Sequence, residues 1–166
     1  AKGGRDELAV ETATELGVDE LVPWRAARSV ADWSPRAAQR WGATVRAAAK
    51  QSRRARVPAV TEALDTTRLL DRVGAVTGAG GAAFVLDGAA PLVLAALPGP
   101  AGAGEVMIVV GPEGGISPEE LDRLVGAGAR AARLGPHTLR ASSAGPAALA
   151  VLQTRLGLWG CPGQPT

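Results

Sequence analysis

The sequence predicts an α/β fold in which helices flank a mostly parallel sheet. Segments with helical periodicity alternate with short apolar segments typical of strands, and this alternation is characteristic of parallel sheets. Segment 105–110 is an almost unbroken apolar run, as expected for a strand that is buried on both faces. With 166 residues, 46% of them hydrophobic, the chain 1–166 is expected to form a single domain with a buried core.

The first half of the chain carries several helix signals. The expected elements are a helix over 8–16, a strand over 18–24, a helix over 35–52 and a short helix over 66–73. Asp6 is a candidate N-cap of the first helix, and Gly17 is a candidate stop. Ser34 followed by Pro35 is typical of an N-cap with proline in the first turn, so the second long helix is expected to begin there.

The second half is expected to supply most of the sheet. The predicted elements are strands over 83–86, 91–97, 105–110 and 130–134, and helices over 118–125 and 144–158. The run Ser117-Pro118-Glu119-Glu120 predicts a capping box at the start of the first of these helices. Ser142 or Ser143 is the candidate N-cap of the last helix.

Composition excludes several classes of protein. The chain has one cysteine, Cys161, and one histidine, His137, so neither an internal disulfide nor a metal site is predicted. The longest apolar run, 89–97, is far shorter than the roughly 20 residues that span a bilayer, and the N-terminal residues contain no signal-peptide core. A cytoplasmic protein without a membrane partner is therefore expected.

Positive charge is concentrated in segment 24–56. This segment holds nine basic residues and one acid, Asp32, a local net charge of +8, whereas the whole chain carries +2. Such a concentration attracts polyanions, because neutralising phosphates releases their condensed counterions. The same pattern also fits a solvated helix face, so charge alone leaves both interpretations open. The candidate RNA-binding cations are Arg25, Arg28, Arg46, Lys50, Arg53 and Arg54.

Two loops join predicted strands to predicted helices, and ligands of open parallel sheets bind at such places. Loop 111–117 contains three glycines, one proline and one carboxylate, so its backbone can approach a ligand closely; a tight strand-to-helix connection is the alternative. Loop 134–144 contains Arg140, which has no packing reason to precede an apolar helix. His137 in the same loop remains ambiguous between a structural group and a base.

These motifs resemble a known family. Gly111-Pro112-Glu113-Gly114-Gly115-Ile116-Ser117, followed by Leu134-Gly135-Pro136 with Leu139-Arg140, is similar to the SPOUT methyltransferases, and most of all to the bacterial 16S ribosomal RNA uridine-N3 methyltransferases of the RsmE family. Lys50-Gln51-Ser52-Arg53-Arg54 strengthens the resemblance, which covers nearly the whole chain. Two positions depart from the family pattern: Ser142-Ser143 replaces a Glu-Thr pair, and Lys50 replaces a glutamate.

The resemblance implies a SPOUT fold with a C-terminal trefoil knot, a homodimer, and an N-terminal RNA-binding barrel that this chain lacks, so that the chain is interpreted as a fragment. It implies S-adenosylmethionine as cofactor and the small ribosomal subunit as partner. By the same resemblance, Gln51 joins the RNA-binding set and Arg140 is the candidate catalytic residue, which would stabilise charge on the uracil carbonyls. The implied cofactor-binding residues are Leu97, Gly111, Pro112, Glu113, Gly114, Gly115, Leu134, Gly135, Pro136, Leu139 and Ser142.

Three activities remain open from the sequence. The first is methylation of uridine N3 in 16S ribosomal RNA, without a strong general base. The second is methylation of a ribose 2′-hydroxyl by another SPOUT enzyme, and the third is a non-catalytic ribosome-assembly factor that binds RNA through segment 24–56. Four tryptophans, one phenylalanine and no tyrosine are few aromatic residues for a protein that reads single strands by base stacking.

Overall fold

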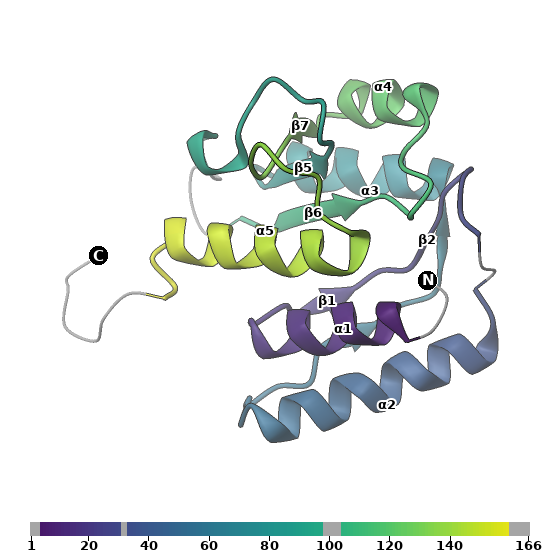
Figure 1. Cartoon of the computed structure of the whole chain (residues 1–166), viewed down its shortest axis with the longest axis vertical. Helices are drawn as coiled ribbons and strands as arrows, with labels where there is room; N and C mark the ends of the chain where they lie inside the picture. The colour runs from purple at the N-terminus through teal and green to yellow at the C-terminus, as the bar shows by residue number, and fades with distance from the viewer. Residues whose placement is uncertain (1–3, 31–32, 98–103, 160–166) are drawn as a thin grey trace.

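The computed structural model describes residues 4–30, 33–97 and 104–159 (Figure 1). In chain order the elements are α1 (Arg5–Glu15), β1 (Glu20–Leu21), β2 (Trp24–Arg25), α2 (Pro35–Gln51), β3 (Ala59–Val60), β4 (Leu64–Asp65), α3 (Thr66–Gly78), β5 (Ala82–Leu86), the 3₁₀ turn η1 (Leu94–Ala96), β6 (Val106–Val110), α4 (Pro118–Gly126), β7 (Arg130–Ala132) and α5 (Ala141–Arg155). Within these ranges every strand pairing is parallel, so the predicted α/β class with flanking helices is confirmed.

The strands of the described segments form three sheets instead of one. The central sheet has the order β6-β5-β7, while β1 pairs with β3 and β2 pairs with β4 in two small sheets. The expected strand over 18–24 is replaced by the two-residue strands β1 and β2, with Val22 and Pro23 between them. Proline has no N–H to donate to a neighbouring strand, which favours a break at this position.

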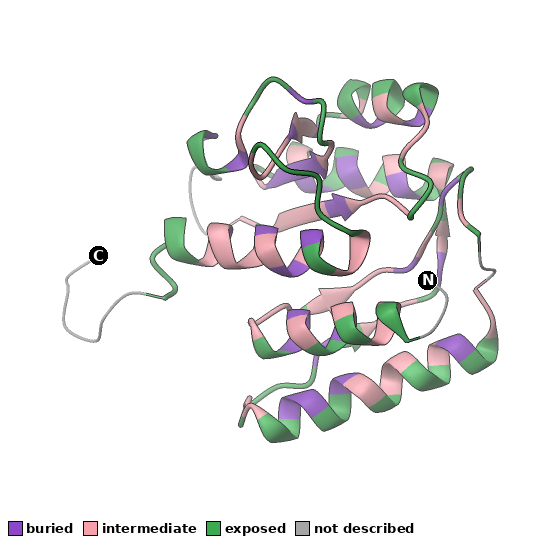
Figure 2. Ribbon diagram, viewed as in Figure 1, coloured by how far each residue is buried: buried purple, intermediate pink, exposed green. Residues whose placement is uncertain are grey.

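Both faces of the central sheet are covered. Successive side chains of a strand point to opposite faces, so the all-apolar β5 needs partners on both sides. Ala83 and Val85 pack with α3 and α4 on one face, and Ala82 and Phe84 pack with η1 and α5 on the other. Figure 2 shows the resulting buried residues in the central strands, α3 and α5.

The N-terminal helices lie beside α5. α1 contacts both α2 and α5 (Figure 1), and its inward residues Val10 and Ala13 are buried. The Gln153 side-chain amide on α5 donates a hydrogen bond to the carbonyl of Leu16 at 3.2 Å, which ties α5 to the end of α1. A second tie comes from Arg72 of α3, which forms ion pairs with Glu20 and Glu105. The central sheet and the N-terminal strands are therefore joined by directional contacts.

Most predicted helices of the first half are confirmed, with one wrong cap. Asp6 does not cap α1: the N-cap is Gly4, with φ 75°, and the Asp6 carboxylate instead accepts a hydrogen bond from the indole of Trp41. Gly17 follows the end of α1 with φ 100°, as expected for a stop. Ser34 caps α2 by accepting from the Ala37 N–H. The helix expected over 66–73 continues to Gly78.

The strand predicted over 91–97 is wrong. Only Val93 forms a bridge there, with Arg133, and η1 follows directly. The carbonyls of Ala90 and Pro91 accept hydrogen bonds from the Arg133 guanidinium at 2.6 Å each. Those carbonyls are therefore occupied by a side chain instead of by a neighbouring strand.

The last helix starts earlier than predicted. α5 begins at Ala141 with Arg140 as its N-cap residue, so Ser142 and Ser143 lie in the first turn and do not cap it. Arg140 has extended backbone angles, and its carbonyl accepts from the Ala144 N–H. The capping box of Ser117 and Glu120 is confirmed, and β5, β6 and β7 lie within the predicted strands or one residue beyond them. Asp32 and Cys161 lie outside the described residues, and the trefoil knot stays a prediction.

Candidate cofactor and RNA site

One edge of the central sheet gathers both predicted loops. Leu86, at the end of β5, pairs with Val110 of β6 and with Ala132 of β7. Because neighbouring strands lie about 4.8 Å apart, the chain leaves β6 and β7 at points roughly 10 Å from each other. Loop 111–117 and loop 133–140 therefore start at the same edge, on either side of the chain that leaves β5.

Loop 111–117 has little freedom to change shape. A Cβ on Gly111 would lie 2.6 Å from Cγ1 of Ile116, which is too close for any other residue without a shift. Gly115 has φ 74°, a left-handed conformation that favours glycine, and its N–H donates to the Pro112 carbonyl at 2.8 Å. The loop ends in the Ser117 capping box, so both its turn and its exit into α4 are fixed.

Loop 133–140 is held by the segment that follows β5. Arg133 binds the carbonyls of Ala90 and Pro91, as described above, and a Cβ on Gly88 would lie 3.5 Å from Oγ1 of Thr138. Leu134 packs against the core cluster that contains Leu97. Two predicted cofactor residues that are far apart in sequence, Leu97 and Leu134, therefore belong to one apolar cluster.

The start of α5 lies against the end of β6 at this sheet edge. A Cβ on Gly145 would lie 3.4 Å from a methyl group of Val110, so the helix approaches the strand closely. Pro146 lies inside α5, and it has no N–H to donate to the carbonyl of Ser142 one turn earlier. That carbonyl therefore lacks its usual partner within the helix. A proline within a helical pattern is the sequence signal that would have indicated it.

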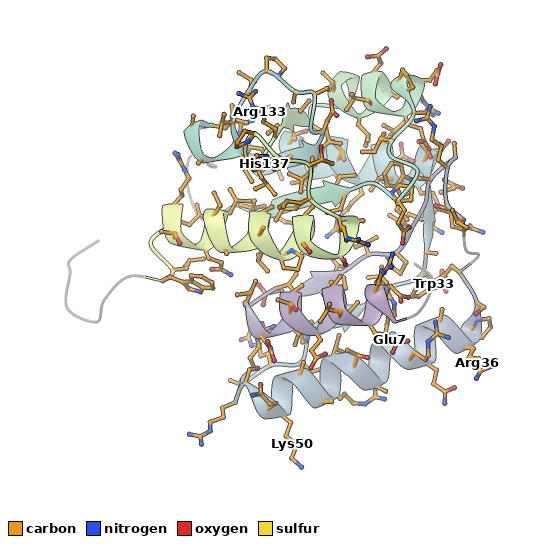
Figure 3. All side chains as sticks on the ribbon, in the orientation of Figure 1. Glu7, Trp33, Arg36, Lys50, Arg133 and His137 are labelled. Atoms are coloured by element: carbon orange, nitrogen blue, oxygen red, sulfur yellow. The ribbon has the colours of Figure 1, made fainter. Side chains whose placement is uncertain are left out.

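The candidate catalytic residue lies in solvent-accessible space. Arg140 is exposed, and its guanidinium forms no hydrogen bond with the described residues. Leu139 is 42% exposed, a large apolar side chain without a full set of partners. His137 is exposed as well, and Figure 3 places it beside Arg133 in the same loop region. Gly135 has open space where a Cβ would be.

A cleft of about 950 Å³ opens next to this edge. It lies between β6 and α5 on one side and α1, β1 and β2 on the other. Four predicted cofactor residues line it, namely Gly111, Pro112, Glu113 and Ser142. The other seven predicted cofactor residues do not line it, namely Leu97, Gly114, Gly115, Leu134, Gly135, Pro136 and Leu139. The predicted set is thus divided among the cleft, the exposed part of loop 111–117 and the neighbouring corner at loop 133–140.

Sequence reasoning missed the aromatic wall of this cleft. Trp24, Trp33 and Trp41 all line it, and the rings of Trp33 and Trp41 meet edge to face with centroids 4.8 Å apart. The carboxylate of Glu113 is exposed and forms no hydrogen bond with any described residue. Trp24 and Trp33 lie outside α2, so helical spacing could not indicate that the three indoles line one cleft.

The predicted RNA-binding residues do not form one surface. Arg46, Lys50, Gln51 and Arg53 are exposed near the C-terminal end of α2, and Figure 3 places Lys50 far from His137 and the loop edge. Arg25 and Arg28 are exposed on the other side, next to the cleft and loop 111–117 respectively. The Arg28 guanidinium donates to the carbonyl of Gly114 at 3.3 Å.

Arg54 is already engaged within the fold. Its guanidinium donates to the carbonyls of Thr14 at 3.0 Å and Val18 at 2.5 Å, and it pairs with Asp19. Its side chain is only 16% exposed. These contacts favour a structural role for Arg54 over the predicted contact with RNA.

Charge at the start of α4 is stabilised by hydrogen bonding. A hydrogen bond to its own backbone N–H, followed by one to the Ser117 hydroxyl, lowers the pKa of Glu119 from its ordinary value. Acidic residues are favoured in the first turn of a helix, because the N–H groups there are unpaired.

The described segments contain no group of three or more metal-ligating side chains and no helix long and apolar enough to cross a bilayer.

Comparison with known proteins identifies the family. Residues 1–153 match the family model described as an RNA methyltransferase domain. The chain belongs to this RNA methyltransferase family. The resemblance drawn from the motifs of the two loops is therefore confirmed at the level of the family.

Individual relatives agree with this assignment. The chain is similar to the ribosomal RNA small subunit methyltransferase E of Mycobacterium tuberculosis, with 46% identity over 162 residues, 95% of this chain and 62% of that protein. Among solved structures it is similar to the same enzyme of Neisseria gonorrhoeae bound to S-adenosyl methionine, with 28% identity, a TM-score of 0.84, and 93% and 62% of the two chains covered. The SpoU methyltransferase AviRb of Streptomyces viridochromogenes, at 18% identity and a TM-score of 0.57, with 93% and 56% covered, shares the fold. The chain thus spans about 62% of the length of its nearer relatives.

Proposed function

We propose that this chain is the cofactor-binding and catalytic part of an enzyme that transfers a methyl group from S-adenosylmethionine to N3 of a uridine in 16S ribosomal RNA. One observation carries the proposal: the two glycine-bearing loops and the start of α5 meet at a single sheet edge beside an open cleft. The names of the relatives support the substrate, and the cofactor bound to the gonococcal enzyme supports the methyl donor.

The residues at the edge fit this cofactor. An adenosine needs apolar contacts and backbone hydrogen-bonding groups. The cluster that contains Leu97 and Leu134, together with the exposed Leu139, would supply the apolar contacts, and the backbone of Gly111 and Gly135 the hydrogen bonds. At Gly111 the backbone can come close to a ligand because no Cβ is present. The carbonyl of Ser142, which lacks the N–H of Pro146 as a partner, adds an acceptor. Pro112, Glu113, Gly114, Gly115 and Pro136 complete the proposed cofactor set.

When bound, S-adenosylmethionine supplies an activated methyl group on a sulfonium sulfur. The protein then has to hold the uracil in line with that group, which accounts for much of the acceleration in such displacements. The N3 proton must leave before or during the transfer, and negative charge then develops on the uracil carbonyls. Arg140, exposed at the start of α5, would donate hydrogen bonds to that charge.

We further propose that no strong general base takes part. His137 and Glu113 are the nearest candidates, and both are exposed without a hydrogen-bonding partner among the described residues that would tune them. His137→Ala and Glu113→Gln should each lower the single-turnover rate by less than about a hundredfold. Removal of a true general base lowers a rate by about 100- to 10,000-fold, so a smaller loss indicates that the residue does not take the proton. A larger loss in either variant, with cofactor binding intact, would identify that residue as the base.

The proposed partners are 16S ribosomal RNA in the small subunit and a second copy of the chain. Arg25 and Arg28 lie nearest to the loop edge, and Arg46, Lys50, Gln51 and Arg53 would extend the contact to more distant phosphates. Two measurements test the function. Calorimetry with S-adenosylhomocysteine should show binding, whereas no heat at high concentration would favour a non-catalytic RNA-binding factor.

Mass spectrometry of nucleosides digested from treated small subunits separates the enzymatic alternatives. N3-methyluridine is the expected product. A methylated ribose would instead indicate the 2′-hydroxyl reaction. The experiment should compare this chain with a chain of the relatives' full length, because the 62% coverage leaves open which segments the RNA reaction requires.

A further inference from the structure

Glu120 is a buried carboxylate that the proposed chemistry does not use. It is 5% exposed, and among the described residues it is the only charged residue that is buried. No lysine or arginine of the described segments forms an ion pair with it. Burying an unpaired charge is unfavourable unless hydrogen bonds replace the lost water. Its hydrogen bonds therefore indicate what keeps it in place.

Three donors from different parts of the chain converge on this carboxylate. Oε1 accepts from the Ala27 N–H at 2.9 Å and from the Thr66 hydroxyl at 2.8 Å, and Oε2 accepts from the Ser117 N–H at 3.4 Å. Thr66 in turn accepts from the indole N–H of Trp24 at 3.3 Å. The segment after β2, the start of α3 and the end of loop 111–117 thus meet at one side chain.

A second contact fixes the same loop three residues earlier. The Arg28 guanidinium donates to the Gly114 carbonyl, and a Cβ on Gly114 would lie 3.2 Å from both Cβ and the carbonyl oxygen of Arg28. Segment 27–28 therefore holds loop 111–117 at Gly114 directly and at Ser117 through Glu120. The loop that is proposed to bind the cofactor is pinned at two points by a segment that is proposed to approach RNA.

Only a carboxylate can make all three contacts. A carboxylate accepts hydrogen bonds on both oxygens, whereas the amide of glutamine accepts on one and donates from the other. Glutamine at position 120 would therefore turn an N–H donor toward either Ser117 or Ala27, each of which presents an N–H. Bonds to a charged acceptor are also stronger than those to a neutral one.

We propose that Glu120 is a positioning residue that sets the shape of loop 111–117 for cofactor binding by joining it to segment 24–28 and to Thr66. The role rests on the proposed cofactor site, but the contacts exist in the free protein and can be measured without the cofactor. Glu120 acts through Ser117 and the loop backbone and does not itself touch the ligand.

The test compares Glu120→Gln with Glu119→Gln. Both variants remove one negative charge from the first turn of α4, but Glu119 is exposed and makes none of these three contacts; its hydrogen bond with the Ser117 hydroxyl can still be formed by the amide of glutamine. In calorimetry with S-adenosylhomocysteine, Glu120→Gln should raise the dissociation constant about tenfold or more, which corresponds to the loss of one charge-assisted hydrogen bond. Glu119→Gln should leave it unchanged. In the free protein, hydrogen exchange of the Ala27 and Ser117 amides should be faster only in Glu120→Gln.

A merely structural role makes a different prediction. Val45→Ala removes buried volume from α2, which packs on α1, and touches neither core cluster of the central sheet; it should lower thermal stability without changing cofactor affinity at a temperature where the variant is folded. If Glu120→Gln behaves like Val45→Ala, with unchanged affinity for S-adenosylhomocysteine, the proposal is overturned. If the unaltered chain does not bind S-adenosylhomocysteine, the proposed function is wrong. In that case the exchange rates of the Ala27 and Ser117 amides still test whether Glu120 holds the loop.

Thr66 provides an independent variant in case Glu120→Gln does not fold. Thr66→Val keeps the shape but removes the hydroxyl that Glu120 accepts from, whereas Thr66→Ser keeps the hydroxyl. We expect Thr66→Val to weaken cofactor binding and to speed exchange at Ser117, and Thr66→Ser to restore both toward the original values. Equal cofactor affinity in the two variants would contradict the positioning role.

Discussion

The loop edge of the central sheet and the exposed end of α2 both carry candidate functional residues, but the fold treats them differently. Loop 111–117 is held by the Gly111–Ile116 approach, the Ser117 capping box and the contacts of Arg28 and Glu120. By contrast, the side chains of Arg46, Lys50 and Arg53, near the end of α2, are exposed and form no hydrogen bonds with the described residues. A preorganised loop suits a small ligand, whereas free cations suit a polyanion that is held by charge.

The largest expected effect would separate chemistry from binding at the loop edge. Arg140→Ala should lower kcat by about 100- to 1,000-fold, as for loss of a donor to developing charge, because the guanidinium has no other described partner. Affinity for S-adenosylhomocysteine, measured by calorimetry, should stay within about twofold, since the effect is confined to the transition state. Arg155→Ala, an exposed arginine on the same helix, is the control and should change neither value. An equal fall in affinity would mean that Arg140 binds the cofactor.

Breaking the shape of loop 111–117 should come next. In Gly111→Ala, the new Cβ would lie 2.6 Å from Ile116 Cγ1, so the loop has to move. Affinity for S-adenosylhomocysteine should fall about ten- to a hundredfold, as for the loss of one or two hydrogen bonds from the loop backbone to the ligand. Gly126→Ala is the matched control, because nothing lies within 4 Å of its added Cβ. Unchanged affinity in Gly111→Ala would show that the cofactor does not depend on this loop.

The roles of the cations at the C-terminal end of α2 can be distinguished by comparing variants of Arg54 and Arg53. Arg54→Ala removes the hydrogen bonds to the carbonyls of Thr14 and Val18. It should lower the free energy of unfolding, measured by urea denaturation, by about 1.5–3 kcal/mol. Arg53→Ala should change it by less than about 0.5 kcal/mol, because the Arg53 side chain is exposed and its left-handed backbone, φ 58°, is equally unfavourable for alanine. If instead Arg54→Ala weakened RNA binding at unchanged stability, Arg54 would return to the RNA-binding set.

The smallest expected effect concerns RNA affinity. Reversing three charges, in Arg46→Glu, Lys50→Glu and Arg53→Glu together, should weaken RNA binding at least about tenfold and make its dependence on salt less steep, because each lost phosphate contact removes about one unit of slope. Cofactor affinity should not change. The control reverses Arg68, Arg123 and Arg155, which are exposed but scattered over three helices. Equal effects in both triple variants would mean that net charge, and not this surface, binds RNA.

Sequence reasoning predicted the parts of the site that depend on local chemistry. The capping box of Ser117, the stop at Gly17 and the apolar β5 and β6 each follow from neighbours within a few residues, and all are confirmed. The resemblance carried by the two loops also led to the right family, because positions such as Gly111 and Gly115 accept only glycine without strain, so the loop's shape is visible in its sequence. Two predictions are wrong because a side chain distant in sequence forms the hydrogen bond. Next to the strand predicted over 91–97, the Arg133 guanidinium binds the Ala90 carbonyl. The Asp6 carboxylate accepts from the Trp41 indole instead of capping α1.

By itself, then, the sequence determined the helices and the three central strands, which loops can approach a ligand, and where positive charge accumulates. The tertiary structure alone decided which charges remain free. Arg54 and Glu120 are both charged residues with hydrogen-bonding partners distant in sequence. Arg54 donates to the carbonyls of Thr14 and Val18. Glu120 accepts from Ala27 and Thr66 as well as from Ser117. The reason is physical: backbone preferences depend on nearby residues, whereas the partner of a long polar side chain depends on segments that meet only after folding.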